Sequence, residues 1–302
     1  MISQNGFSII HTFDINSHTQ PNGVHTFSIT HSPTTDGYVG YAGPVFGGAV
    51  DLWRSSSLFD WTPTAENPIF DRESIRWPSV FNDDETLYLA ARVDIDSRWQ
   101  TAHTLMSLGS RIPAPFLPPV GKTKIVFFAS DDGVSFEFKG TLIDKASTGQ
   151  SKNQNPFLFE RANGQPGIVY YAGGTEAYEI RIRTADTVPG LATASDQIVL
   201  SSESLVAAPS VYYDPVQDRY VLLVEQLHET TRKWITVAYP LDGLKQATQE
   251  HQVLFADNEA CPFPYVRDET LFLFTSRCLS DVRGNQIDGQ WEGRIYSYDL
   301  ST

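Results

Sequence analysis

The chain has 302 residues, of which 41% are hydrophobic and 12% are aromatic, and its formal net charge is −14. This composition suffices for the core of one large all-β domain or two small ones. The acidic balance disfavours nucleic acids and anionic membranes as partners, and without a run of about 20 apolar residues no membrane-spanning helix is expected.

The amino-terminal segment predicts a strand and carries no targeting signal. The stretch "MISQNGFSIIHTFDIN" lacks a basic start, a long apolar run and a small-residue cleavage site. We therefore expect a cytoplasmic protein, or a secreted one whose signal has been removed. The alternation within "GFSIIHTFDI" predicts a lone strand over residues 7–15.

Five related segments follow, and each predicts two strands joined by a turn. They read "SITHSPTTDGYVGYAG", "SIRWPSVFNDDETLYLAAR", "QNPFLFERANGQPGIVYYAGG", "VAAPSVYYDPVQDRYVLLVE" and "EACPFPYVRDETLFLFTSR". Their alignment gives five anchor positions with spacings of 51, 78, 53 and 53 residues: Phe27, Pro78, Pro156, Pro209 and Pro262. The long interval contains an insertion at residues 99–122, which includes the proline-rich "RIPAPFLPP".

A third strand follows each hairpin, as in "AVDLWRSSSLFDW" and "KIVFFASDDGVSF". Five such units of about 50 residues predict an all-β fold, a five-bladed β-propeller with about four antiparallel strands per blade, in a single domain over residues 1–302. Because ring closure usually needs both chain ends in one blade, we predict that residues 7–15 lie beside the last strand, "GRIYSYDL". A two-sheet sandwich is the alternative, which the regular spacing disfavours.

We expect the start of each first strand and the end of each second strand to lie together at one mouth of the central channel. The first set comprises residues 24–26, 75–77, 153–155, 206–208 and 259–261, and the second comprises Gly43, Arg92, Gly173, Glu225 and Ser276. These positions are rich in groups that suit a ligand pocket, although a mouth that merely faces water would also be polar. The predicted ligand contacts are His25, Arg76, Trp77, Arg92, Asp94, Gln154, Asn155, Glu176, His228 and Arg277.

The segments "WPSVFND", "NPFLFE", "APSVYYD", "CPFPYVRD" and "SSSLFDW" resemble the five-bladed glycoside hydrolases, of which family 43 is the nearest and families 32 and 117 are relatives. The resemblance covers nearly the whole chain. It implies a propeller that acts on a saccharide through three axial carboxylates by an inverting mechanism. The turn "SDDGVSF" resembles the Asp-box of sialidase propellers and is interpreted as structural.

None of the three carboxylates that family 43 implies is found at its matching position. The first-blade aspartate falls near His25, with Asn22 as the only nearby relative of a carboxylate. The aspartate before the third anchor proline falls on Asn155, and the glutamate two residues before the fourth falls on Ala207. The resemblance therefore indicates the scaffold more strongly than the chemistry.

The carboxylates that remain at the expected mouth are Glu225, Glu259, Asp94 and Glu176. Glu225 and Glu259 come from adjacent blades, so we predict them as a catalytic acid and base. In the alternative, Glu225 forms a structural ion pair with Arg277 or Arg92. Cys261 and Cys278 are expected to be neighbouring buried thiols, with a disulfide as the alternative.

Three functional hypotheses follow. The first is an enzyme acting on a saccharide or glycoside with non-standard catalytic residues, and the second is a non-hydrolytic sugar-binding propeller. The third is a biosynthetic cyclase or transferase on a repurposed glycosidase scaffold. The sequence contains no phosphate-binding glycine loop, zinc-protease motif or calcium loop, so no cofactor or metal is expected, and no oligomeric state is predicted.

Overall fold

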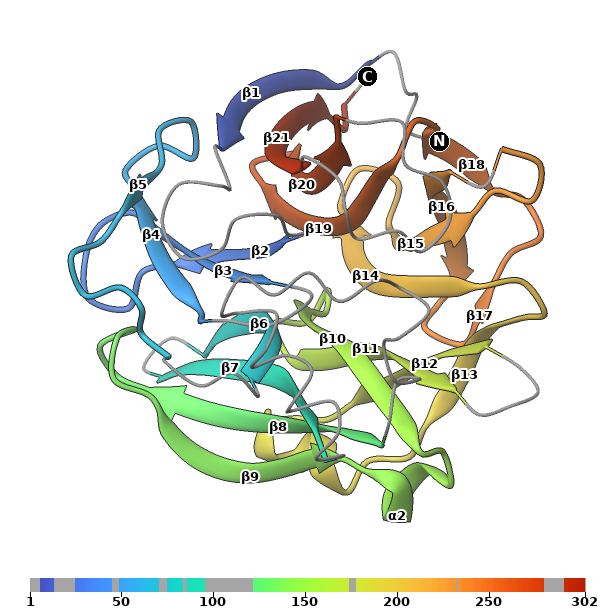
Figure 1. Ribbon diagram of the computed structural model, residues 1–302, viewed down its shortest axis with the longest axis horizontal. Helices are drawn as coiled ribbons and strands as arrows, with labels where there is room; N and C mark the ends of the chain where they lie inside the picture. Colours follow the sequence, from blue (N-terminus) through green and yellow to red (C-terminus); the bar gives the residue numbers. More distant parts are fainter. Residues whose placement is uncertain are drawn as a thin grey trace, which may run out of the picture.

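The computed structural model describes residues 6–13, 25–44, 49–70, 75–83, 86–95, 122–173, 178–231, 233–279 and 291–301. Five antiparallel sheets surround a central axis and form a five-bladed β-propeller, which confirms the predicted fold (Figure 1). Apart from Lys122, the predicted insertion at residues 99–122 lies outside the described residues.

Each blade runs from an inner strand at the axis to an outer strand at the rim. Blade 1 contains β2 (His25–His31), β3 (Tyr38–Pro44), β4 (Asp51–Ser55) and β5 (Thr62–Pro63). Blade 2 contains β6 (Ile75–Asp83), β7 (Thr86–Asp94), β8 (Thr123–Ser130) and β9 (Glu137–Ile143). Blade 3 contains β10 (Lys152–Glu160), β11 (Pro166–Gly173), β12 (Tyr178–Thr184) and β13 (Gln197–Ser202).

Blade 4 contains β14 (Val206–Asp214), β15 (Arg219–Leu227) and β16 (Trp234–Asp242), and β16 pairs on its outer side with both β17 (Gln246–Ala247) and β18 (Gln252–Phe255). Blade 5 contains β19 (Glu259–Arg267), β20 (Thr270–Cys278), β21 (Trp291–Asp299) and β1 (Ser8–Phe13). Two short helices, α2 (Lys145–Thr148) and the 3₁₀ helix η3 (Pro189–Ala192), lie in the connections of blades 2 and 3.

The ring closes through the amino-terminal strand, as the sequence predicts. Strand β1 pairs antiparallel with β21, from Ser8 opposite Ser297 to Phe13 opposite Gly293. Figure 1 shows β1 beside the red strands of blade 5. The last two residues of the predicted strand, 14–15, lie outside the described residues.

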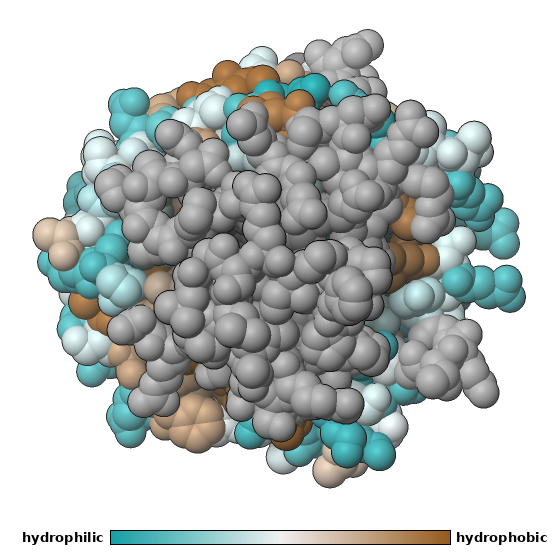
Figure 2. Space-filling model, in the orientation of Figure 1, coloured by the Kyte–Doolittle hydropathy of each residue, from teal (hydrophilic) through white to brown (hydrophobic). Residues whose placement is uncertain are grey.

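The core lies between neighbouring blades, where alternate side chains of facing sheets interlock. Between blades 4 and 5, for example, Leu223 and Leu254 pack with Leu273 and Tyr298. The rim of the molecule is mostly hydrophilic among the described side chains (Figure 2), which is consistent with the acidic composition. No helix in the described ranges is long and apolar enough to cross a membrane.

The anchor prolines mark a repeated β-bulge. The residue before each proline has a left-handed backbone, with φ of 58° at Trp77, 57° at Asn155, 46° at Ala208 and 56° at Cys261. The register between the first two strands shifts at the same place in all four blades. Strand β2 has Phe27 in place of the proline and pairs without a shift. A left-handed non-glycine residue costs about 1–3 kcal/mol, and such strain persists where the surroundings enforce it, often at functional sites.

A turn between β8 and β9 ties blade 2 to blade 1. Asp132 accepts the backbone N–H groups of Ser135 and Val134 at 2.7 Å each, and these hydrogen bonds lower the pKa of its carboxyl to about 2. The carbonyl of Gly133, which has φ of +73°, accepts the hydroxyl of Tyr41 at 2.7 Å. The Asp-box-like segment therefore has a structural role.

The serine after the anchor position connects one inner strand to the next. The Ser28 hydroxyl accepts the N–H of Val80 at 3.0 Å, and the Ser79 hydroxyl accepts the N–H of Leu158 at 2.8 Å. The same position in blade 4 is Ser210, but the facing residue in blade 5 is Pro264, which has no N–H to donate. The buried Ser210 hydroxyl consequently has no hydrogen-bond partner in the described part of the chain.

We expect the same substitution at Ser79 and Ser210 to have unequal effects on the free energy of unfolding. Ser79→Ala should lower the free energy of unfolding by about 1–3 kcal/mol, because it leaves the buried N–H of Leu158 without an acceptor. Ser210→Ala should change it by less than about 0.5 kcal/mol or increase it, because no hydrogen bond is lost. Urea denaturation of both variants measures the difference, and equal losses would contradict this account of blade-to-blade contacts.

Candidate functional site

The N-terminal mouth is the end of the channel at which the inner strands begin, and it comprises the four bulges and the ends of β7, β11, β15 and β20. In blade 2, Arg76 lies directly opposite Arg92 in the strand register. Both guanidinium groups contact Asp94, at 3.1 Å from Arg76 and 3.0 Å from Arg92, and all three side chains are at most 4% exposed. The cluster holds two buried cations on one carboxylate within the blade.

Several buried polar atoms near this mouth lack a hydrogen-bond partner in the described structure. They are Nε1 of Trp77, Oε1 of Gln154 and Nε1 of Trp291. Trp77 and Asn155 both occupy the left-handed bulge position and are buried, and Gln154 is half-buried beside them. Because buried polar groups usually find partners, these orphaned atoms are exceptions within an otherwise satisfied interior.

The three polar residues at positions 153–155 have different hydrogen-bonding environments. Asn153 is fully buried, accepts the Thr148 hydroxyl at 3.0 Å and donates to the carbonyl of Gln150 at 2.8 Å. It is therefore part of the scaffold, whereas Oε1 of Gln154 has no hydrogen-bond partner in the described part of the chain. Gly173 ends β11, as the sequence alignment predicts, and in the strand register Gln154 pairs with Tyr171.

Glu225 is a buried carboxyl at the mouth. It lies on β15 directly opposite Ala207 on β14, and opposite residues of an antiparallel pair project from the same face. Its Oε2 accepts the backbone N–H of Cys261 at 3.0 Å, and the Cys261 sulfur lies at 3.7 Å. Burial raises the pKa of Glu225 to about 7, because the hydrogen bonds from Cys261 only partly offset the loss of solvation.

Glu225 does not form the alternative ion pair with Arg92 or Arg277. Arg92 contacts Asp94 at 3.0 Å, and Arg277 contacts Asp257 at 3.5 Å. Among the described residues no cation pairs with Glu225. A buried carboxyl without a cationic partner is expected to hold its proton, since desolvation disfavours the charged form.

Glu259 begins β19 and has different partners. Its Oε1 accepts the Thr275 hydroxyl at 2.6 Å and the Tyr296 hydroxyl, both from blade 5. Burial and the charge of Glu259 raise the pKa of Tyr296, so this phenol donates rather than ionises. The two predicted catalytic glutamates thus stand on neighbouring blades with separate hydrogen-bond partners.

The two cysteines are buried and carry reduced thiols, as expected, rather than a disulfide. Burial, and then the nearby Glu225 carboxyl, raise the pKa of Cys261 well above its ordinary value. Its thiol is therefore an unreactive neutral group against the Glu225 carboxyl.

The remaining predicted contacts lie farther from these groups or beyond what is described. His228 is exposed in the turn after β15, where its Nδ1 accepts the N–H of Thr231 at 3.2 Å. Arg277 is one-third exposed beside Asp257. His25 begins β2, its side chain is not among those described, and Glu176 lies outside the described residues.

Trp291, the first residue of β21, is a part of the mouth that the sequence analysis missed. It pairs with Cys278 in the strand register. Only its position at the start of a strand that follows the fifth hairpin could have signalled it. No group of three or more histidine, cysteine or acidic side chains that could hold a metal ion occurs in the described ranges.

No protein-family model matches this sequence, and no curated protein matches it. Solved structures do match over nearly the whole chain. An endo-arabinase from Bacteroides thetaiotaomicron VPI-5482 has a TM-score of 0.64 at 15% identity, with 96% of this chain and 97% of that chain covered. An α-L-arabinofuranosidase from Lactobacillus brevis has a TM-score of 0.63 at 12% identity, covering 94% of each chain.

A third match is a mannose phosphorylase from Leishmania mexicana in complex with phosphate ion, with a TM-score of 0.59 at 12% identity over 93% of this chain and 85% of that chain. Further matches include a thermostable family-43 glycoside hydrolase, so this chain has the propeller fold that family 43 enzymes share. Identities this low establish the fold and leave the chemistry to the residues of the mouth.

Proposed function

We propose that this protein acts on a saccharide or glycoside at the N-terminal mouth, with Glu225 as the proton donor. The observation that carries the proposal is the register that places Glu225 opposite Ala207. The resemblance to family 43 implies an acid at residue 207, and here an acid stands on the adjacent strand instead. A pKa of about 7 suits a group that must hold a proton near neutral pH and then release it.

The other residues of the mouth support ligand binding. Trp77, Gln154 and Trp291 each carry a buried polar atom without a hydrogen-bond partner among the described residues, and Asn155 adds an amide from the next bulge position. Amides and indoles are suited to sugar hydroxyls and to the apolar faces of sugar rings. Glu259, on the blade whose Cys261 N–H donates to Glu225, is the second carboxylate of the proposed site.

A second candidate function is sugar binding without turnover. It is favoured by Asn155 and Ala207, which stand where the family resemblance implies two of the three carboxylates. An amide cannot titrate and a methyl group has no acid function, so binding would survive where hydrolysis would not. Turnover by the unmodified protein is the measurement that separates the two functions.

The proposed ligand class predicts a thermal shift. Arabino-, xylo- and manno-oligosaccharides at ten times their dissociation constant should stabilise the protein by about 1.4 kcal/mol. That corresponds to a rise in Tm of about 2 °C for a chain of this size. Gln154→Ala should reduce the rise and leave the ligand-free Tm within about 1 °C, because the lost oxygen has no partner in the described part of the chain.

The matched control is Gln197→Ala, the same substitution at an exposed position on β13 of the same blade. It should leave the ligand-induced shift intact. Turnover of aryl-glycosides is assayed with and without inorganic phosphate, because one structural neighbour is a phosphorylase in complex with phosphate ion. If none of these saccharides shifts the Tm, the proposed ligand class is wrong.

A further inference from the structure

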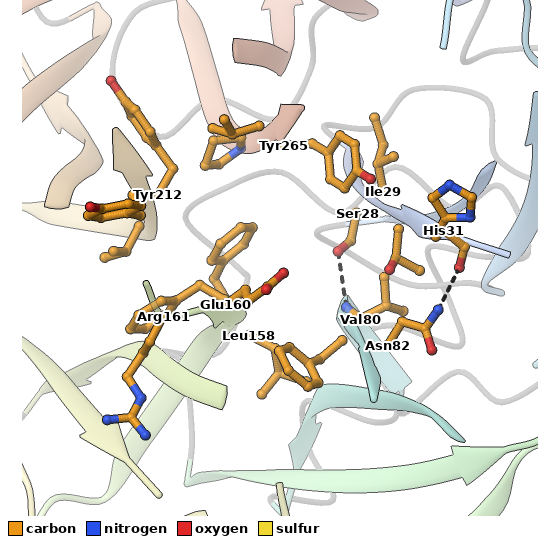
Figure 3. A pocket seen from close by; sticks show the side chains of 18 of the residues that line it. Ser28, Ile29, His31, Val80, Asn82, Leu158, Glu160, Arg161, Tyr212 and Tyr265 are labelled. Atoms are coloured by element: carbon orange, nitrogen blue, oxygen red, sulfur yellow. Dashed lines mark hydrogen bonds between the residues drawn. The ribbon is translucent and has the colours of Figure 1, made fainter. Parts of the chain in front are cut away.

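A second cavity lies at the C-terminal mouth, the opposite end of the channel, where the inner strands end. Its volume is about 580 Å³, which is within the range of cavities that hold small organic molecules. Figure 3 shows side chains from different blades around this one space. The proposed saccharide site uses none of the lining residues, to which all five inner strands contribute: residues 28–31, 80–82, 157–160, 211–213 and 264–266.

Most of the lining residues are apolar or aromatic. Ile29, Val80 and Leu158 supply aliphatic surface from three different blades (Figure 3). Phe157 adds a ring that is held edge-on against Phe263, with 5.2 Å between the ring centroids. Aromatic rings favour offset or edge-to-face contacts with other rings, and apolar walls favour a ligand that buries little polar surface. The lining therefore suits a flat apolar body.

Glu160 and Arg161 of the lining are both engaged within the protein. Arg161 donates to the carbonyl of Ala185 at 3.0 Å and to the side chain of Gln165, and its guanidinium turns away from the cavity (Figure 3). Glu160 also has an interaction partner within the chain. A charged ligand that is buried here loses its hydration, and neither of these side chains is free to compensate for that loss. The cavity therefore favours an uncharged ligand.

Tyr265 contributes a neutral hydroxyl to the lining. The residue is half-buried and its ring packs edge-on against that of Tyr38, with 6.0 Å between the centroids. Burial, and then the charges of Glu160 and Asp268, raise the pKa of Tyr265 to about 12, so the phenol keeps its proton at pH 8. Its hydroxyl makes no hydrogen bond within the described part of the chain. A phenol in this state can donate to an oxygen atom of a ligand.

We infer that the C-terminal mouth binds an uncharged aromatic molecule that carries an acceptor oxygen, such as an aromatic alcohol. Burial of the ring between the apolar walls supplies most of the affinity. The Tyr265 hydroxyl donates a hydrogen bond to the oxygen and fixes the orientation of the molecule.

Calorimetric titration of the full chain at pH 8 tests the inference with benzyl alcohol, benzylammonium and benzoate. These three probes share one ring with a one-carbon substituent and differ in charge. Benzyl alcohol should bind saturably, and each of the two ions should bind at least about tenfold more weakly, because the cavity offers no free counter-charge. Tyr265→Phe keeps the ring and removes the hydroxyl, so it should weaken the binding of benzyl alcohol by about 2- to 10-fold.

Tyr178→Phe is the matched control, because it makes the same substitution at a half-buried tyrosine of β12 outside the lining. It should bind benzyl alcohol as the wild type does, and equal Tm values for the two variants verify that both fold. The inference is overturned if benzyl alcohol shows no saturable binding up to about 50 mM. It is also overturned if either ion binds as tightly as the alcohol, or if Tyr265→Phe binds the alcohol as tightly as the wild type. The titration requires no turnover, so its outcome is independent of the proposed action on saccharides.

Discussion

Replacing Glu225 by glutamine should abolish turnover and at the same time stabilise the protein at pH 8. The loss of a general acid lowers the rate by about 10²- to 10⁴-fold. The gain in stability arises because glutamine retains an oxygen for the N–H of Cys261 but never has to be buried as an anion. The carboxyl titrates at about 7 against an ordinary value of 4.5, which corresponds to about 3 kcal/mol in the free energy of unfolding.

The sign of this effect follows from proton binding. Between pH 4.5 and about 7 the folded protein keeps the Glu225 proton while the unfolded chain releases it, so stability falls as the pH rises through that window. Below pH 4.5 both states are protonated and the contribution disappears. Urea denaturation at pH 4.5 and pH 8 should therefore show the wild type and Glu225→Gln converging at the lower pH and separating at the higher one.

Glu250→Gln provides the control for both measurements, because it removes an exposed carboxylate of the same blade. It should retain turnover and follow the wild type at both pH values. If Glu225→Gln is as active as the wild type, or if it gains no stability at pH 8, Glu225 is not the proton donor proposed here. If Glu225 lowers stability when ionised and is also required for turnover, it shows the trade-off between stability and activity that is common at active sites.

The sequence was sufficient to predict the blades because their signals repeat. Each anchor, from Phe27 to Pro262, is followed by a hydrophobic strand and a turn, and the intervals between anchors match one blade. The amino-terminal strand was placed correctly because a closed ring requires a partner for the last blade. Repetition and closure are properties of the whole pattern, so errors at single residues did not affect them.

The site was harder to predict because its geometry depends on single residues. The bulges at Trp77, Asn155, Ala208 and Cys261 require left-handed backbone at non-glycine residues, which local propensity disfavours at all of them except the asparagine. They shift the register, and the register decides that Glu225 faces Ala207. Burial in the assembled ring raises the pKa of Glu225, and the hydrogen bond that partly offsets this comes from Cys261 on the next blade, 36 positions along the sequence.

The ion-pair network at the rim of blade 3 should have the largest effect on stability. Asp196 lies before β13 and accepts the Tyr170 hydroxyl, the Arg183 side chain and, at 3.1 Å, Arg181. Arg181 also contacts Glu179, whereas Arg183 is 2% exposed and pairs with no other carboxylate in the described ranges. Arg183 donates further to the carbonyls of Leu142, Leu191 and Ala192, which joins blade 2 to the connection before β13.

Asp196→Ala should lower the free energy of unfolding by about 3–5 kcal/mol, because it leaves the buried Arg183 guanidinium without its counter-charge. Asp186→Ala, on the exposed surface of the same blade, should cost less than about 1 kcal/mol. Burial opposes ionisation of Asp196, but hydrogen bonds from Arg183 and Tyr170 outweigh it and lower the pKa of this carboxyl. The stability that the ionised Asp196 contributes to the folded protein is therefore complete above the unfolded pKa near 3.9. It is lost as the pH falls through the lower pKa of the folded state. Urea denaturation at pH 7 and pH 3 should therefore show the free energy of unfolding of the wild type approaching that of Asp196→Ala at the lower pH. If Asp196→Ala loses no more stability at pH 7 than Asp186→Ala does, the network does not stabilise the blade.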